Sequence, residues 1–244
     1  MNICIATSEQ EFRIKAANEV AAVLTQNPNA VLGLATGQTP VGMYEELVVR
    51  YQRGEIDFSS CKTVNLDEYV GLSGEEPHSY HYYMDQHLFK HVNIQKEHTH
   101  IPDGTASNTQ LECQAYNQLL DSLGGIELLV LGLGHDGHIG FNEPGTSLEG
   151  RTHCTELTKR TIDANQRFFK NRENMPKKAI TMGLRDIMAA RRILLLVSGI
   201  EKAETVRAAL TGPITLEIPA SVLQLHHQVS VILDAAAASA LTNN

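Results

Sequence analysis

The stretch "IELLVLGLGHDGHIGFNEPGT", residues 126–146, joins two unlike segments. Its first seven residues are apolar apart from one glutamate, which is typical of a strand covered on both faces of a parallel sheet. The remainder is rich in glycine and carries four ionisable side chains, those of His135, Asp136, His138 and Glu143. Ligands of open α/β sheets bind beyond the carboxyl ends of the strands. The stretch therefore predicts both the fold class and the location of a site.

Other apolar runs of the chain resemble this one, and amphipathic segments lie between them. The apolar runs are 30–35, 62–66, 126–132, 191–199 and 228–234, and the helical segments are 9–26, 41–53, 79–91, 107–123 and 200–211. This alternation predicts an α/β fold with a doubly wound, mostly parallel sheet, Rossmann-like and three-layered, with helices on both faces. Because the 244 residues contain no repeat or linker, we expect a single domain, 1–244.

The composition argues against several classes of function. A net charge of −8 disfavours nucleic acid as a partner, and no apolar run approaches the about 18 residues of a membrane span. The N-terminus lacks the basic and apolar regions of a secretory signal. The cysteines have no C-x-x-C spacing, which favours a cytoplasmic location, and we expect Cys4 and Cys61 to be core residues. The expected partner is a small molecule.

A second strand end carries the residues Thr36-Gly37-Gln38-Thr39, followed by Pro40. We expect Pro40 at the first position of a helix. Backbone N–H groups at a helix start bind anions, and Thr36 and Thr39 add hydroxyl groups. A tight turn capped by Thr39 is an equally good interpretation. The missing lysine excludes a Walker loop.

Two more strand ends carry charged residues. Asp67 and Glu68 follow one strand, where a carboxylate is a candidate general base if the pocket is dry, or a turn cap if it is not. Ser198 follows another and leads into a helix with Lys202 in its first turn. That cation opposes the helix dipole, so a bound anion would offset its cost, although a solvated lysine is the alternative. Arg167 is a further candidate cation for a phosphate.

The histidines of the opening stretch allow two interpretations. A histidine whose second ring nitrogen is held by a carboxylate, as Asp136 or Glu143 could hold His138, suits proton transfer. His135 and His138 also form an H-x-x-H pair, but without a third ligand we favour no metal. Aromatic and apolar residues at helical spacing in segment 79–91 predict core packing rather than a site. They are Tyr80, Tyr83, Met84, His87, Leu88 and His91.

Six segments of the chain, in order, resemble the glucosamine-6-phosphate deaminase family. They are "GLATGQTP" (33–40), "VNLDEYVGL" (64–72), "LGLGHDGHIGFNEPGTS" (131–147), "RTH" (151–153), "ANQRFF" (164–169) and "PKKAITMG" (176–183). The resemblance implies conversion of glucosamine 6-phosphate and water to fructose 6-phosphate and ammonia, without a cofactor. The phosphate loop alone is shared with 6-phosphogluconolactonases and with sugar-phosphate sensors. These two remain the alternatives, although the chain carries no helix-turn-helix ahead of the sheet.

The resemblance also implies roles for individual residues. Asp67 would take the C2 proton and return it to C1, while His138, oriented by Asp136 and Glu143, would open the sugar ring. Segment 157–175 would form a lid over the sugar. The residues implied to bind the phosphate are Thr36, Gly37, Gln38, Thr39, Arg167, Ser198 and Lys202.

Two departures from the family pattern concern affinity and regulation. Gln38 stands where the family usually has glycine. A side chain at this position would narrow the phosphate loop and so change the affinity for substrate. Longer members are hexamers activated by N-acetylglucosamine 6-phosphate, and their effector pocket contains basic residues where this chain has His153 and Thr155. The chain also lacks their C-terminal extension. We therefore expect a monomer or small homo-oligomer with hyperbolic kinetics.

Overall fold

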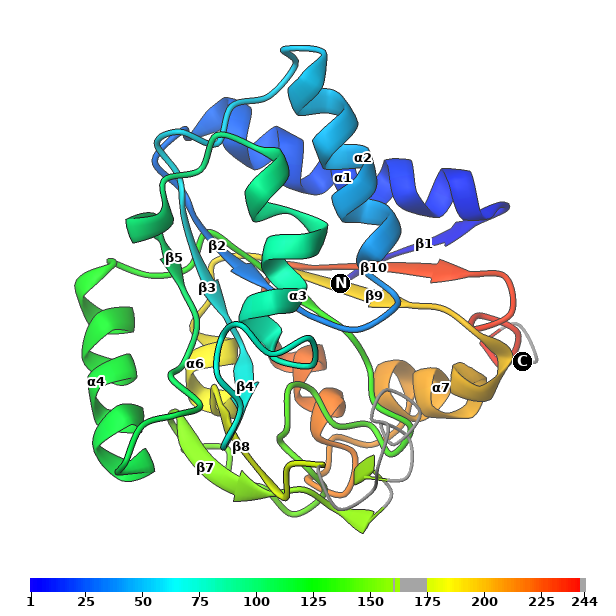
Figure 1. The fold of residues 1–244 in the computed structure, drawn as a ribbon. Coiled ribbons are helices and arrows are strands. Elements are labelled where there is room, and N and C mark those ends of the chain that lie inside the picture. Colours follow the sequence, from blue (N-terminus) through cyan, green and yellow to red (C-terminus); the bar gives the residue numbers. More distant parts are fainter. Residues whose placement is uncertain (160, 163–174, 242–244) are drawn as a thin grey trace.

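The main sheet is built from parallel strands only. The structure, a computed structural model, describes residues 1–159, 161–162 and 175–241. Within them the sheet contains β1 (Asn2–Ala6), β2 (Val31–Leu34), β3 (Lys62–Asn65), β5 (Thr99–His100), β6 (Leu128–Leu131), β9 (Ile193–Val197) and β10 (Val229–Asp234) (Figure 1). Their order is β1-β10-β9-β6-β2-β3-β5. The predicted α/β fold with a mostly parallel sheet is confirmed.

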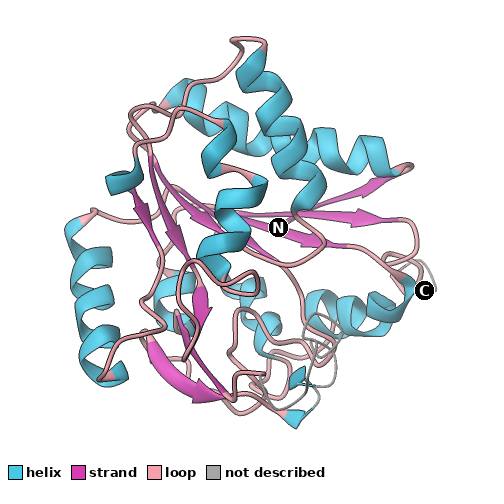
Figure 2. Cartoon of the chain, viewed as in Figure 1, coloured by secondary structure: helices cyan, strands magenta, loops and turns pink. Residues whose placement is uncertain are grey.

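Helices cover the sheet on both sides (Figure 2). They are α1 (Glu9–Gln26), α2 (Val41–Gln52), α3 (Tyr80–His87), α4 (Thr109–Ser122), α6 (Leu184–Met188) and α7 (Ala203–Thr211). In α1, Ser8 caps the first turn by accepting from the N–H of Glu11 at 3.1 Å. Its buried face carries Ala16, Val20 and Leu24, four residues apart, so one apolar stripe packs on the sheet.

The strand order places the site. From β2 the sheet grows outward through β3 to β5, and the chain then returns to the other side of β2 with β6. The direction of winding therefore reverses between β2 and β6, and ligands of doubly wound sheets bind at such a reversal. The loop after β2 starts at Ala35, and the glycine-rich loop after β6 starts at Gly132. The two most polar loops predicted from the sequence thus meet at one point.

A small second sheet was not predicted from the sequence. It consists of β4 (Asp67–Tyr69), β8 (Lys178–Thr181) and β7 (His153–Glu156), all antiparallel. Asp67 pairs in register with Thr181 across this sheet. These strands are three or four residues long, too short for a clear alternation of apolar and polar residues.

Several predicted boundaries and environments differ in the structure. The helix predicted for 79–91 ends at His87, and a separate 3₁₀ turn covers Phe89–His91. The helix predicted for 200–211 begins with a 3₁₀ turn, Ile200–Lys202, before α7. Pro40 is the N-cap of α2 rather than its first residue. Cys4 is only half-buried because β1 lies at the sheet edge, whereas Cys61 is fully buried as expected.

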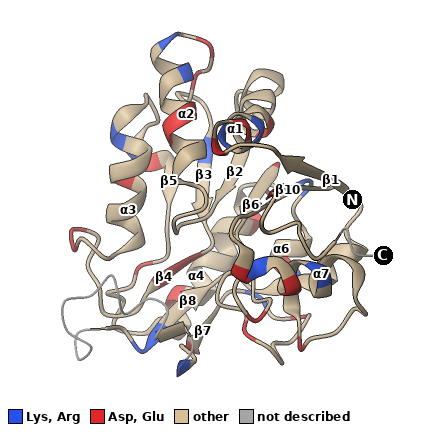
Figure 3. Ribbon diagram, turned by 90° about the vertical axis from the view of Figure 1, so that its right-hand side faces the viewer, with Lys and Arg blue, Asp and Glu red and all other residues tan. Residues whose placement is uncertain are grey.

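Charged residues of both signs are mixed along the outer helices (Figure 3). Arg13 on α1 lies 2.7 Å from Glu9 and 2.8 Å from Glu45 on α2, so it ties the two helices together. Along α7, Arg207 pairs with Glu204 one turn earlier at 2.8 Å. No helix among the described residues is long and apolar enough to cross a membrane.

Candidate active site

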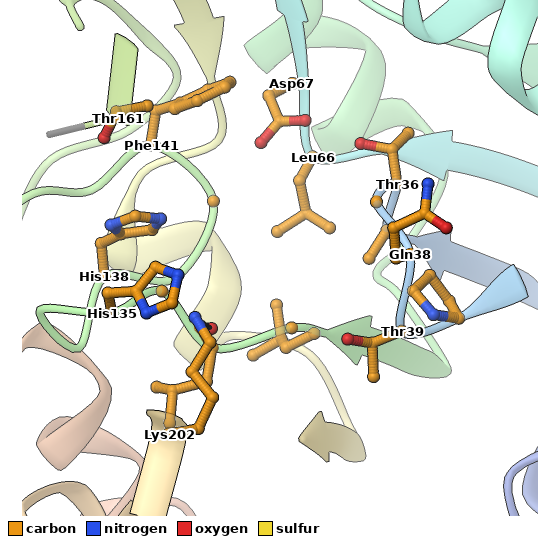
Figure 4. Close-up of a pocket in the computed structure, with 18 of the residues that line it drawn as sticks. Thr36, Gln38, Thr39, Leu66, Asp67, His135, His138, Phe141, Thr161 and Lys202 are labelled. Carbon is orange, nitrogen blue, oxygen red and sulfur yellow. Dashed lines mark hydrogen bonds between the residues drawn. The ribbon is translucent and has the colours of Figure 1, made fainter. Parts of the chain in front are cut away.

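A cavity of about 340 Å³ lies where the loops after β2 and β6 meet (Figure 4). Most residues singled out from the sequence line it. They are Thr36, Gly37, Gln38, Thr39, Asp67, His138, Ser198 and Lys202. His135 also lines it, beside His138. Side chains from strand ends far apart in the sequence therefore share one cavity.

Two predicted site residues in the described part of the chain are not on its wall. Asp136 and Glu143 lie behind His138, where they contact its ring. Arg167 and most of segment 157–175, the predicted lid, lie outside the described residues.

His138 is held from behind by two carboxylates. Its Nδ1 atom lies 2.6 Å from Oδ1 of Asp136 and 3.3 Å from Oε2 of Glu143. The ring rests against Gly134, where a Cβ atom would lie 2.3 Å from the imidazole, so only glycine permits this approach. Because both carboxylates use Nδ1, Nε2 is the ring nitrogen that remains for a ligand in the cavity.

This environment keeps the ring protonated. Burial opposes the charged form of His138, but hydrogen bonds and charge from Asp136 and Glu143 outweigh it and raise its pKa to about 9. Burial likewise opposes ionisation of Asp136, but the hydrogen bond and charge of His138 hold its pKa well below the usual range. At neutral pH the pair is an imidazolium beside a carboxylate.

Glu143 is itself fixed by hydroxyl groups. Its Oε1 atom accepts from Thr161 at 2.5 Å and from Thr158 at 3.3 Å. Glu143 is buried, so these bonds stabilise a carboxylate that water does not reach. The second carboxylate on His138 is therefore held in place.

Asp67 is the buried carboxyl of the cavity. Figure 4 places its carboxyl group facing the cavity, between the His138 side and the Thr36 side. Burial, and secondarily the charge of Glu68, raise the pKa of Asp67 to about 8, although the charge of His138 acts in the opposite direction. A carboxyl with such a pKa both accepts and donates a proton near neutral pH, as a shuttle requires.

The loop after β2 forms the opposite wall. Thr36, Gln38 and Thr39 lie across the cavity from His135 and His138 (Figure 4). Two tyrosines hold this loop from behind: the hydroxyl of Tyr83 donates to the carbonyl of Gly37 at 2.5 Å, and that of Tyr44 to the carbonyl of Ala35 at 2.6 Å. The loop ends at the N-terminus of α2, whose first N–H groups attract anions.

Lys202 brings positive charge to the cavity. Among the described lining residues it is the only lysine or arginine. Its Nζ atom donates to the carbonyl of Leu133 at 2.8 Å, which holds the ammonium group at the end of the loop after β6. Ser198 lines the same region directly after β9. These groups suit an anionic end of a ligand.

Sequence reasoning missed three residues of this site and one role of a fourth. Phe141, Thr161 and Glu201 line the cavity but gave no sequence signal apart from nearness to the motifs. Tyr80, interpreted as a core residue, does pack against a buried apolar cluster, but it also lines the cavity. Met84 and Leu88 of the same stripe are in the core, as predicted.

The only group of at least three potential metal ligands among the described residues is Asp136, His138 and Glu143, whose ligand atoms lie within 4.8 Å of one another. His135 does not belong to it. Both carboxylates already contact the same nitrogen of His138.

The fold and this cavity define a class of sugar-phosphate enzymes. Residues 7–232 match the family described as glucosamine-6-phosphate isomerases/6-phosphogluconolactonase. The chain belongs to this family.

Within the family, two similar proteins of about half identity are glucosamine-6-phosphate deaminases. A glucosamine-6-phosphate deaminase from Thermoanaerobacter sp. (strain X514) is 52% identical over 239 residues, which are 98% of this chain and 94% of that protein. One from Clostridium perfringens (strain 13 / Type A) is 51% identical over 241 residues, 99% of this chain and 100% of that protein.

Among solved structures, a deaminase likewise resembles this chain more closely than a 6-phosphogluconolactonase does. That of a monomeric glucosamine-6-phosphate deaminase superimposes with a TM-score of 0.96 at 46% identity, covering 98% of this chain and all of that one. The 6-phosphogluconolactonase of Trypanosoma brucei gives a TM-score of 0.80 at 19% identity over 99% of this chain and 98% of that one. The second likeness concerns the fold alone.

Proposed function

We propose that this chain converts glucosamine 6-phosphate and water to fructose 6-phosphate and ammonia. One observation carries the proposal: a buried carboxyl, Asp67, shares a cavity with a histidine, His138, that two carboxylates hold from behind. Aldose–ketose isomerisation needs one group to open the ring and another to move the C2 proton. The deaminases of about half identity support the same reaction.

His138 opens the sugar ring. Its Nε2 atom gives a proton to O5 and takes the proton of the O1 hydroxyl, so the C1–O5 bond breaks and an aldehyde forms at C1. Asp136 and Glu143 keep the ring oriented and favour its charged form. The histidine ends the step in the protonation state in which it began.

Asp67 then moves a proton between carbons. It takes the C2 proton while O1 gains one, which leaves an enolamine, and it returns the proton to C1 as the amino nitrogen releases one. The resulting C2 imine adds water and loses ammonia, giving the ketone. A carboxyl whose pKa is raised to about 8 gains and loses a proton easily in this pH range, which suits both halves of this transfer.

The phosphate binds at the other side of the cavity. We assign it to the loop of Thr36, Gly37, Gln38 and Thr39, with Ser198 and Lys202 adding donors. Backbone N–H groups at the start of α2 and the Lys202 ammonium supply positive potential there. The predicted contribution of Arg167 stays a prediction.

Release of ammonia tests the proposal. The chain is incubated with glucosamine 6-phosphate, galactosamine 6-phosphate or mannosamine 6-phosphate, and separately with 6-phosphogluconolactone. We expect ammonia and fructose 6-phosphate from the first compound. Hydrolysis of the lactone without ammonia from any aminosugar would instead favour the lactonase alternative. Binding without turnover of either kind would favour a sensor.

A variant tests the ring-opening step. His138→Gln keeps a polar side chain but cannot shuttle the proton between O1 and O5. We expect it to slow turnover of the ring-closed substrate more than turnover of substrate supplied already open. Equal losses for both forms would remove this role from His138.

We also infer that residues 1–244 act as one domain, as a monomer or small homo-oligomer in the cytoplasm. The four cysteines, all unpaired, suit a reducing compartment, and a relative 46% identical is described as monomeric. Light scattering on the purified chain measures its mass; a hexamer would contradict the inference.

A further inference from the structure

The buried carboxylate of Glu68 lies next to Asp67 but outside the cavity. Its side chain is fully buried and accepts from donors on two elements. Oε1 accepts from the N–H of Tyr69 at 2.8 Å and of Tyr80 at 2.9 Å. Oε2 accepts from the N–H of His81 at 3.0 Å and contacts Nδ1 of His81 at 2.9 Å. The four contacts hold both oxygen atoms of this buried carboxylate in place.

These bonds join the strand that carries Asp67 to the start of a helix. Asp67 and Glu68 are consecutive residues of β4, so their side chains point to opposite faces. Asp67 reaches the cavity, whereas Glu68 caps the first residues of α3. Gly104 closes over this contact: a Cβ atom there would lie 2.1 Å from the carbonyl oxygen of Tyr69 and 3.2 Å from Cγ of Glu68.

Through Tyr80 the same contact reaches the phosphate loop. Tyr80 is the first residue of α3, lines the cavity together with Thr36, and packs its ring against that of Tyr69 with 4.8 Å between the centroids. Its ring also stacks on Phe141, another lining residue, with an angle of 6° between the planes. Glu68 therefore fixes Asp67, on one side, relative to Thr36, on the other.

We propose that Glu68 is a positioning residue, which sets the distance between the base Asp67 and the phosphate loop and places a buried negative charge next to the Asp67 carboxyl. The inference rests on the proposed function of Asp67. A sugar phosphate held at its phosphate end must present C2 to the base, and small errors in that spacing cost rate. A second negative charge next to a carboxylate makes proton uptake by it easier.

The electrostatic half of the proposal depends on the groups around both carboxylates. Burial is the larger cause of the raised pKa of Asp67, the charge of Glu68 adds to it, and His138 opposes it. His81, whose side chain is 40% exposed, offsets part of the charge of Glu68 when it is protonated. The titratable groups facing the two carboxylates are Tyr69 of β4, Tyr80 and His81 of α3, Tyr116 of α4, His138 after β6 and Asp103 beside His81. Among the described residues, Glu68 is the group whose negative charge raises the pKa of Asp67.

Two substitutions of Glu68 separate the effect of its charge from the effect of its side-chain length. Glu68→Gln keeps the length of the side chain and removes its charge. We expect kcat to fall, and we expect the acidic limb of the pH profile, where kcat/KM falls as pH decreases, to move to lower pH by about one unit. Glu68→Asp keeps the charge but is one methylene shorter, so kcat falls while the limb stays in place. Ser79→Ala is the matched control: it removes the hydroxyl that accepts from the N–H of Tyr82 at 3.1 Å, weakening the same helix start without changing charge.

The control is expected to lower the melting temperature and leave the limb at the wild-type pH. If the acidic limb of kcat/KM stays at the wild-type pH in Glu68→Gln, the charge of Glu68 does not act on Asp67. If kcat is unchanged in Glu68→Asp, Glu68 is not a positioning residue. If Glu68→Gln does not fold, Glu68→Asp still decides the second point. Titration of Asp67 by ¹³C-carboxyl NMR, in wild type and Glu68→Gln, needs no turnover. It therefore tests this inference even if wild type releases no ammonia, an outcome that would reject the proposed function alone.

Discussion

The Oδ1 atom of Asp136 lies 2.6 Å from Nδ1 of His138. Only one residue separates the two in sequence, and a turn of glycines folds them onto each other. Because Glu143 approaches the same nitrogen at 3.3 Å, the ring bears charge beside two carboxylates while its other nitrogen remains for the cavity. Asp67 also faces the cavity, and burial raises the pKa of its carboxyl group, which favours the neutral form. The protonation of these groups is accessible to experiment.

The pH dependence of kcat/KM is expected to show a narrow alkaline maximum. Catalysis needs Asp67 ionised, and its pKa is raised to about 8, so activity falls as pH decreases below that value. It also needs His138 protonated, with a pKa raised to about 9, so activity falls as pH increases further. Initial rates at low substrate concentration from about pH 6 to about pH 10 test this. A profile that is flat across neutral pH would contradict it.

A variant identifies the basic limb of that profile. Asp136→Asn removes the hydrogen-bonded charge that raises the pKa of His138, so the basic limb should move to lower pH by about one unit. Glu201→Gln is the control, since Glu201 also lines the cavity but is not one of the two carboxylates that contact Nδ1 of His138. A limb that moves equally in both variants would not be the titration of His138.

Asp67→Asn should abolish deamination while glucosamine 6-phosphate still binds. The amide keeps the shape of the carboxyl but cannot accept the C2 proton, and general-base catalysis contributes about a hundredfold or more. Stopped assays give kcat, and calorimetric titration gives affinity. If the variant keeps more than about a tenth of wild-type kcat, Asp67 is not the base.

The same substitution should stabilise the fold, increasingly so with pH. In wild type the pKa of Asp67 is raised from 3.8 to about 8, so the folded state holds a proton that the unfolded state releases. Stability is therefore lost as pH rises between these values, and the loss is complete above the upper one. Asn has no such loss. We expect the melting-temperature difference between variant and wild type to grow from about pH 4.5 to about pH 8; a constant difference would be evidence against this titration.

Activity should survive exhaustive treatment with EDTA. Asp136, His138 and Glu143 are close enough to hold a metal, but Nδ1 of His138 already contacts both carboxylates, and a metal there would displace the Nδ1 proton that these carboxylates hold. Ammonia release is measured before and after chelation, with added Zn²⁺ as a further arm. Lost activity that zinc restores would show that the three residues are metal ligands.

Substrate saturation should be hyperbolic and unaffected by N-acetylglucosamine 6-phosphate. In β7, His153 and Thr155 occupy the positions where longer family members are expected to hold basic residues, so an anionic effector meets little fixed positive charge. Nearby Arg151 is already engaged, 2.8 Å from Asp121 and 3.0 Å from Asp186. Substrate titrations with and without the effector at neutral pH decide the matter. A sigmoidal curve that the effector makes hyperbolic would show a second site.

The main sheet could be predicted from the sequence because each of its predicted strands is marked by a local apolar run. The run 126–132 and the four like it are mainly apolar and do not alternate, since parallel strands under helices are buried on both faces, and each contains an observed strand. The polar residues after these runs also predicted where the site lies. Chains of this topology bring the carboxyl ends of their strands to one edge.

The second sheet and the surroundings of Tyr80 could not be found in this way. The strands of that sheet are short, and β4 pairs with residues more than a hundred positions away, as Asp67 does with Thr181, so no local periodicity marks them. Tyr80 has the helical spacing of a core residue, and only the packing of α3 against the cavity distinguishes the two roles.

By itself, the sequence determined the parallel α/β sheet and the chemical groups at its strand ends, because hydrophobic periodicity and residue type are properties of the chain. The tertiary structure alone decided which groups meet and how strongly each holds its proton. Asp67 becomes a weakly acidic carboxyl because β4 buries it beside Glu68, and His138 becomes a strong base because the chain folds two carboxylates onto one ring nitrogen. Desolvation and charge proximity are set by atoms brought together in space, and the order of residues does not encode them locally.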